Sequence, residues 1–106
     1  GGGMEAAFLS LDNDVPNLIR FILSQGYLDI ETAGSPEYYE SALLLLSKVA
    51  QNFPDTLTSL WTAELNQAIR KLLLLPDTQQ YSGKGGLMIQ ANNSIRGELL
   101  AGVSSS

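Results

Sequence analysis

The sequence predicts an all-α protein, a bundle of three to four helices. Two leucine-rich stretches, Ser35–Asn52 and Asp55–Leu75, carry apolar residues at the spacing of a helix. Proline, glycine and capping residues stand where such helices would begin and end. The 106 residues leave room for one small domain, so most of the chain must join a common core.

The first predicted helix begins at Asp14 and ends at Gly26. The Asp14 carboxylate can cap free backbone N–H groups, and Pro16 is tolerated in the first turn because its missing N–H has no partner there. Gly26 can take the left-handed conformation that ends helices. The apolar stripe of this helix comprises Val15, Leu18, Ile19, Ile22 and Leu23.

The second predicted helix begins at Ser35, a capping residue that Pro36 and Glu37 follow. It ends at Phe53-Pro54, because a proline disfavours the helical conformation of the residue before it. Its apolar arc is wider than a surface helix needs, so we expect neighbours on more than one side. The arc comprises Tyr38, Ala42, Leu45, Leu46, Val49, Ala50 and Phe53, with Tyr39 and Leu43 at its edge.

The third predicted helix begins at Asp55 or Thr56, and Pro76 ends it after Leu75. Trp61 stands in the middle of its apolar stripe and is expected in the core. The stripe comprises Leu57, Trp61, Leu65, Ala68, Ile69, Leu72 and Leu75.

The chain divides into four segments. Residues 1–13 hold Gly1–Gly3, a pattern typical of a cloning remnant, and a short turn over Met4–Leu11; residues 14–76 form the helical core. Residues 77–92 are predicted to be a flexible glycine-containing linker, and residues 93–106 a short amphipathic helix with a serine-rich end.

The last segment carries Ala91, Ile95, Leu99 and Val103 at helical spacing. Asn93 or Ser94 would cap its helix and Gly102 would end it. We favour docking of this helix on the bundle as a fourth member. It could instead bind a groove on another protein, or be a partner peptide joined by design.

A long helix, a tight Phe53-Pro54-Asp55 turn and an antiparallel long helix resemble one unit of a HEAT or armadillo-type α-solenoid. The resemblance covers Ser35–Leu75 and rests on helix length, turn length and leucine spacing; no second copy at a fixed period is visible. It implies a scaffold or complex subunit whose helical faces hold protein partners. A plain three-helix bundle stays open as the alternative.

Composition excludes several classes of function. A net charge of −5 with six scattered Lys and Arg argues against binding nucleic acid directly. The sequence has no histidine and no cysteine, so it lacks the commonest catalytic base and the commonest metal ligands, and we expect no enzyme activity, cofactor or metal. The longest apolar runs are too short to span a membrane and no leader opens the chain, so we expect an intracellular, soluble protein, without distinguishing cytoplasm from nucleus.

Two short motifs resemble functional ones. Ser82–Gly86 is similar to a phosphate-binding loop, but Leu87-Met88 stands where a Lys-Ser/Thr pair belongs, so the glycines indicate a linker. Asn92-Asn93-Ser94 matches a glycosylation sequence, but without a leader it is read as a turn or helix cap.

Three large apolar residues, Phe21, Leu44 and Leu74, fall on the polar arcs of their helices. Together with Ile95 and Leu99 of the terminal helix, they are the predicted protein-binding residues. The sequence therefore predicts a non-catalytic protein–protein interaction module within a larger assembly. The alternative is a self-contained small helical adaptor that binds a peptide or helix in its own groove.

Overall fold

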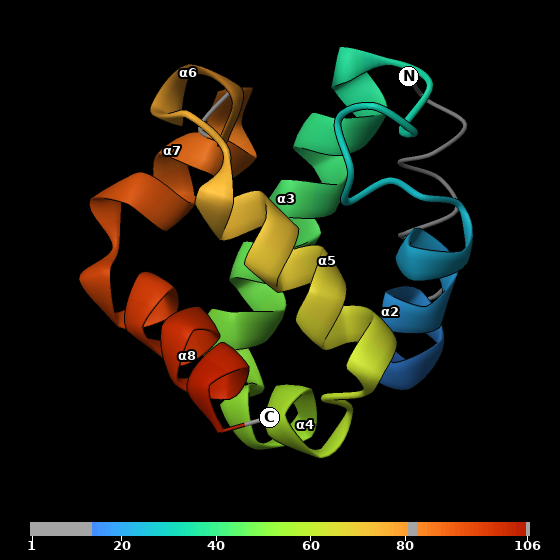
Figure 1. Ribbon diagram of the computed structural model, residues 1–106. Coiled ribbons are helices and arrows are strands. Elements are labelled where there is room, and N and C mark those ends of the chain that lie inside the picture. Colours follow the sequence, from blue (N-terminus) through green and yellow to red (C-terminus); the bar gives the residue numbers. More distant parts are fainter. Residues whose placement is uncertain (1–13, 81–82, 106) are drawn as a thin grey trace.

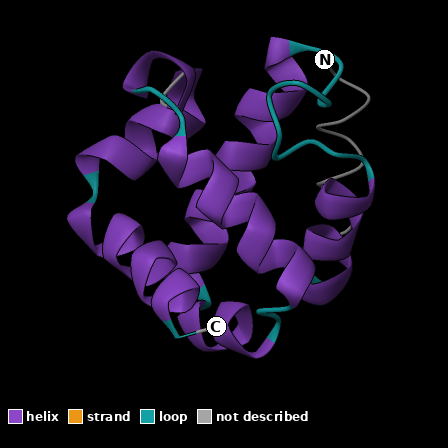
Figure 2. Ribbon diagram, viewed as in Figure 1, coloured by secondary structure: helices purple, strands orange, loops and turns teal. Residues whose placement is uncertain are grey.

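The computed structural model describes residues 14–80 and 83–105, and within these ranges the chain is all-helical, without strands (Figures 1 and 2). The predicted all-α class is confirmed. The cloning remnant predicted at Gly1–Gly3 and the turn predicted over Met4–Leu11 fall outside the described residues. The helices are α2 (Val15–Ser24), α3 (Pro36–Asn52), α4 (Pro54–Ser59), α5 (Ala63–Leu74), α6 (Asp77–Gln80), α7 (Gly83–Ala91) and α8 (Asn93–Ser104).

Helix α3 is the centre of the fold, and α2, α4, α7 and α8 all contact it (Figure 1). Its start follows the prediction: the hydroxyl of Ser35 accepts a hydrogen bond from the Tyr38 backbone N–H at 3.2 Å, and Pro36 occupies the first turn. Its end at Asn52, before Phe53, is also as predicted.

The buried face of α3 is turned relative to the predicted arc. Tyr39 and Leu43, expected at the edge, are fully buried, as is Ser47, whereas Phe53 is 49% exposed. The reason is α7, which lies against the side of α3 that carries Leu43 and therefore makes that side interior. The core residues of the described chain are Val15, Leu18, Ile19, Ile22, Leu28, Ala33, Tyr39, Ala42, Leu43, Leu46, Val49, Ala50, Leu57, Leu65, Ile69, Leu72, Ile89, Ile95 and Leu99.

Helix α2 begins and ends as its sequence predicts. The Asp14 carboxylate accepts a hydrogen bond from the Asn17 N–H at 3.2 Å. Gly26, with φ of 71°, follows the helix in the left-handed conformation. Four of the five predicted stripe residues are buried, and Leu23 is half-buried.

The prediction of one continuous third helix is wrong, because the chain breaks between α4 and α5. The hydroxyl of Thr58 donates to the Pro54 carbonyl oxygen at 2.9 Å, one of the local bonds by which hydroxyl residues compete with regular helix. Thr62 is extended, and its hydroxyl accepts a hydrogen bond from the Leu65 N–H at 3.2 Å, which starts α5 anew. Trp61 therefore lies in a turn and is half-buried, not in the middle of a core stripe.

The prediction of a flexible linker over residues 77–92 is also wrong, because this segment contains α6 and α7. Gly85 and Gly86 are buried, and Gly85 lies against the backbone of α3. A Cβ at Gly85 would stand 2.7 Å from the Glu40 carbonyl oxygen and 2.8 Å from the Leu43 carbonyl carbon, so only glycine permits this approach. The Glu40 carboxylate accepts a hydrogen bond from the Lys84 N–H at 3.2 Å and so caps α7 from another helix.

Helix α8 docks on the bundle, the arrangement favoured above. Ile95 and Leu99 are buried in the common core, and α8 contacts α3, α5 and α7. The cap is Asn92, whose side-chain oxygen accepts hydrogen bonds from the backbone N–H groups of Ser94 at 3.0 Å and Ile95 at 3.3 Å. The predicted caps, Asn93 and Ser94, are therefore one and two residues too late.

Gly102 does not end α8, which continues to Ser104. The glycine has a packing role instead, because it lies against Trp61. Within the described ranges, no helix is both long and apolar enough to cross a membrane.

Candidate protein-binding cleft

A cleft of about 700 Å³ lies between the α4–α5 turn and the last turns of α8. Figure 1 shows the end of α8 beside α4, at the same end of the molecule. The cleft is lined mainly by small and hydroxyl-bearing side chains around one large aromatic residue. The lining residues are Leu57, Thr58, Trp61, Thr62, Ala63, Asn66, Glu98, Ala101, Gly102 and Ser105.

Trp61 is held in the cleft by local hydrogen bonds. Its indole N–H donates to the side-chain oxygen of Asn66 at 3.1 Å. The Thr62 cap fixes the start of α5, and hence the position of Asn66 one turn later. The polar edge of the indole is thus satisfied within the chain, and its hydrocarbon part remains for apolar contacts.

The six-membered ring of Trp61 lies directly on the backbone of α8. A Cβ at Gly102 would stand 2.6 Å from Cη2 of the ring, closer than non-bonded carbon atoms approach. The missing side chain therefore creates the seat for Trp61. The ring links α5 to α8 and lines the cleft between them.

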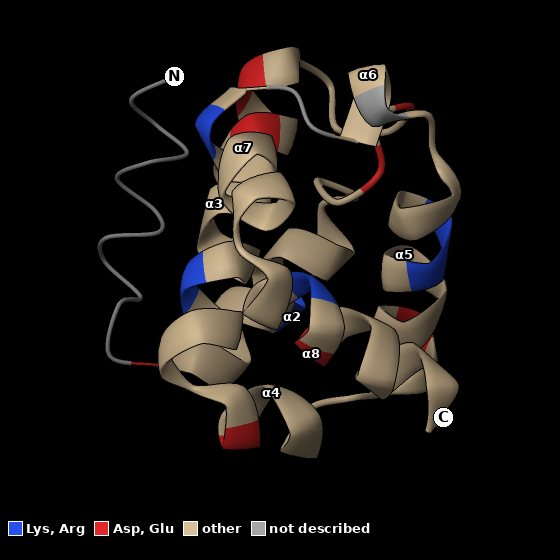
Figure 3. Ribbon diagram, turned by 90° about the vertical axis from the view of Figure 1, so that its left-hand side faces the viewer, with Lys and Arg blue, Asp and Glu red and all other residues tan. Residues whose placement is uncertain are grey.

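Glu98 is the one charged side chain among the described residues that line the cleft. It lies four residues before Gly102, so both are on one face of α8. Its carboxylate is exposed and has no hydrogen bond or ion pair with any described residue. Figure 3 shows Lys and Arg on several helices, and none of those described lines the cleft.

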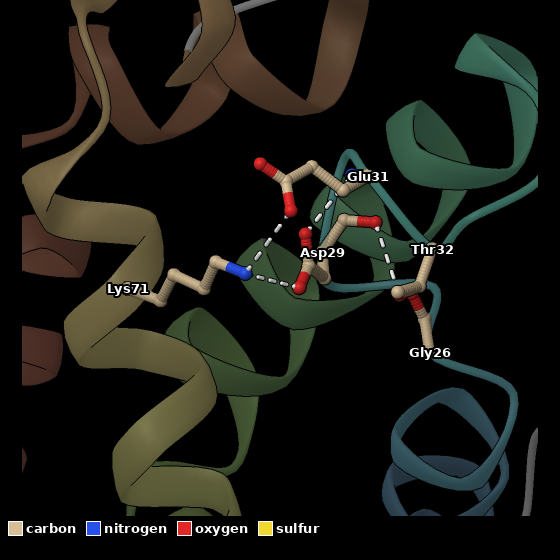
Figure 4. A network of polar contacts seen from close by, with 5 residues as sticks. All are labelled: Gly26, Asp29, Glu31, Thr32 and Lys71. Atoms are coloured by element: carbon tan, nitrogen blue, oxygen red, sulfur yellow. Dashed lines mark hydrogen bonds and ion pairs between the residues drawn. The ribbon is translucent and has the colours of Figure 1, made fainter.

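A second, smaller hollow of about 250 Å³ lies between α5 and the loop after α2. Its rim carries a polar network (Figure 4), in which Nζ of Lys71 lies 2.6 Å from Oδ2 of Asp29 and 3.7 Å from Oε2 of Glu31. The Thr32 hydroxyl donates to the Gly26 carbonyl oxygen at 2.7 Å and closes the loop on itself. The network ties this loop to α5.

The hydrogen bond from Lys71 lowers the pKa of Asp29, and the same bond raises the pKa of Lys71. Both side chains are partly exposed, so the pair is of the weak surface type. Among residues 14–80 and 83–105, no group of three or more acidic residues is placed to hold a metal ion. We assign the network a structural role.

The hydroxyl of Tyr39 is buried and has no hydrogen-bond partner among the described residues. Burial raises the pKa of Tyr39 to about 12, because it disfavours the charged phenolate, and the negative charge of Asp29 adds to the effect. This side chain is fully enclosed and is not a site for ligands.

The structure does not bring the predicted protein-binding residues together. Leu74 is 79% exposed at the end of α5, whereas Phe21 packs edge-on against Tyr27 with ring centroids 5.8 Å apart. Leu44 is half-buried on α3, where α7 passes over its backbone. Figure 1 shows α2 and α7 on opposite sides of α3, so Phe21 and Leu44 face different neighbours.

Ile95 and Leu99 are core residues in this fold and offer no exposed surface. The residues that form the cleft were absent from the predicted set. The signal that could have revealed them is the hydroxyl-rich run around Trp61, with Thr58 and Ser59 before it and Thr62 after it, which is typical of a helix break and a new cap.

No protein family, no curated protein and no solved structure matches this chain.

Proposed function

We propose that the chain is a non-catalytic protein–protein interaction module that binds a peptide or helix of its partner in the cleft beside Trp61. The observation that carries the proposal is the setting of Trp61, a half-buried ring with its N–H satisfied by Asn66 and its hydrocarbon part lining an open cleft. Tryptophan is among the residue types that contribute most to binding energy at protein interfaces.

The other lining residues suit a peptide ligand. Thr58 and Ser105 line the cleft, and their hydroxyl oxygens, which donate to carbonyl groups within the chain, can still accept hydrogen bonds from peptide N–H groups. Ala63 and Ala101 leave room for a side chain. The volume of about 700 Å³ falls in the range of roughly 300–1,000 Å³ typical of ligand pockets. The absence of histidine and cysteine from the sequence supports binding over catalysis.

Trp61 is the single tryptophan of the chain, so its fluorescence reports on the cleft alone. We expect peptides selected from a random display library against the folded chain to shift this emission in a saturable titration. Ala101→Tyr should block the cleft and abolish the shift. The matched control is Ala91→Tyr, because Ala91 is an exposed alanine at the end of α7, away from the cleft.

The proposal fails if the selected peptides bind without changing Trp61 emission, or if both tyrosine variants bind equally well. Circular dichroism of both variants checks that each is folded.

A second candidate function, the scaffold or solenoid unit that the HEAT or armadillo resemblance implies, is favoured by one observation, the exposure of Leu74. A neighbouring unit would cover this side chain. Leu74→Ser should then lower the mass measured by sedimentation at high protein concentration while leaving thermal stability unchanged. A monomeric parent chain at that concentration, with no mass to lose, would argue against this candidate.

A further inference from the structure

We infer that the occupant of the Trp61 cleft is a peptide segment carrying an arginine, whose guanidinium stacks on Trp61 and pairs with the Glu98 carboxylate. The inference rests on the proposed function and specifies the chemistry of the partner.

The ring and the carboxylate both line the cleft, from the two elements that form it. Trp61 sits on Gly102, and Glu98 is one helical turn earlier on the same face of α8. Residues four apart on a helix have Cβ positions about 5–6 Å apart, so a planar cation over the ring can reach the carboxylate. Arginine suits this pair because its guanidinium both stacks on aromatic rings and forms forked bonds to a carboxylate.

Charge points to the same ligand. Glu98 has no cation partner among the described residues, and its negative charge is the one such charge in the lining. Ser105, which also lines the cleft, follows the last turn of α8, and the helix dipole is negative at this end of the helix. The net charge of −5 adds a long-range attraction for a basic segment.

The alternatives leave these groups in worse surroundings. An acidic segment would meet Glu98 and the negative helix end directly. A wholly apolar segment would cover the Glu98 carboxylate without supplying a partner, which is costly.

The test uses the peptide with the highest affinity from the library selection, prepared with each arginine in turn replaced by citrulline, a neutral residue of nearly the same shape. Each peptide is titrated into the parent chain and into Glu98→Gln, with Trp61 emission as the readout. We expect one arginine whose replacement weakens binding to the parent by about 10- to 100-fold, the range for a hydrogen bond to a charged group. The same replacement should have little further effect on Glu98→Gln, because the two changes remove one interaction.

Three outcomes would overturn the inference. In the first, Ala101→Tyr blocks peptide binding but no citrulline replacement weakens it. The role of arginine is then refuted, while the proposed peptide-binding function is retained. If no library peptide occupies the cleft, both proposals fail. If sedimentation shows a dimer that Ala101→Tyr dissociates, the occupant is a second copy of the chain.

Discussion

Helices α3 and α7 pack against each other and form for different reasons. Helix α3 carries its own start and stop signals, with Ser35 and Pro36 at one end and Pro54 after the other. Helix α7 reads Gly-Lys-Gly-Gly-Leu-Met-Ile-Gln-Ala, and Gly85 and Gly86 within it each disfavour helix by about 1 kcal/mol relative to alanine.

Contacts with α3 compensate for this weakness. Glu40 caps the first turn of α7, and Gly85 lets the two backbones approach closely. The Ser47 hydroxyl, bonded at 2.8 Å to the Leu43 carbonyl oxygen, lies 3.4 Å from the Gly85 carbonyl oxygen and adds a weaker contact. Gly85 therefore weakens α7 locally and at the same time allows it to pack against α3.

The largest expected effect is that of Gly85→Ala. The added methyl group would collide with backbone atoms of Glu40, Leu43 and Leu44, which cannot rotate away as a side chain can. We expect a loss of about 1–3 kcal/mol of unfolding free energy, the cost of overpacking. Urea denaturation measures it; unchanged stability would show that the α3–α7 approach is looser than described.

The next effect concerns Tyr39, whose buried hydroxyl has no hydrogen-bond partner within residues 14–80 and 83–105. Tyr39→Phe should raise the unfolding free energy by about 1 kcal/mol at neutral pH, because an unsatisfied buried polar group is destabilising. Circular dichroism during thermal denaturation would detect the gain. A loss of stability on this change would mean that the hydroxyl does have a partner.

The same residue predicts a pH dependence. Its pKa is about 12 in the folded chain against 10.0 for the ordinary group, so its neutral form is favoured by folding. The contribution of Tyr39 to the free energy of unfolding is therefore complete below pH 10. It is lost as pH rises towards 12, at about 1.4 kcal/mol per pH unit. Subtracting the stability curve of Tyr39→Phe from that of the parent isolates this contribution; parallel curves would refute it.

A smaller effect of opposite sign is expected at Gly97, the matched control for Gly85. Both glycines lie within helices, but a Cβ at Gly97 would have no neighbour within 4 Å in the part of the chain that the structure describes. Gly97→Ala should therefore stabilise the protein by about 0.5–1 kcal/mol through helix propensity alone. If Gly85→Ala and Gly97→Ala changed the free energy of unfolding equally in urea, the close contact of Gly85 with α3 would have no energetic consequence.

The smallest effect is expected from the ion pair between Lys71 and Asp29. Lys71→Met should change the melting temperature less than Gly97→Ala does, because exposed pairs are weak. The pKa of Asp29 is lowered by this pair, so the pair stabilises above the ordinary pKa of 3.8 and its effect is lost as pH falls below that value. A melting temperature that drops strongly in Lys71→Met at neutral pH would show that the pair is stronger than an ordinary surface ion pair.

The parts of the fold that the sequence predicted are those with local signals. Caps, prolines and Gly26 act on neighbouring residues, so the bounds of α2 and α3 follow from them. The wrong predictions depend on contacts between distant residues. No residue near Gly83–Ala91 in the sequence indicates a helix. The cap of α7 comes from Glu40, and its close packing depends on the backbone of α3.

The candidate cleft was missed for a related reason. Trp61 fits the apolar stripe of a continuous helix. Because the helix breaks before Thr62, Trp61 is not part of that stripe in the structure. From the sequence pattern alone, Gly102 is predicted to end a helix. Its contact with Trp61 depends on the position of α8 beside α5, which the sequence pattern does not give. The exposure of Leu74 could be predicted from the helical wheel, because it depends only on the position of this residue on the polar face of its own helix.

The most direct test of the contrast between α3 and α7 is the helix content of two peptides of equal length, residues 35–44 and 83–92, in water with increasing trifluoroethanol, followed by Cα chemical shifts. Trifluoroethanol promotes helix formation according to local preference, without the contacts of the fold. We expect the 35–44 peptide to become helical and the 83–92 peptide to stay largely non-helical. Equal helix content in the two peptides would contradict this expectation, because α7 would then be specified by its own sequence.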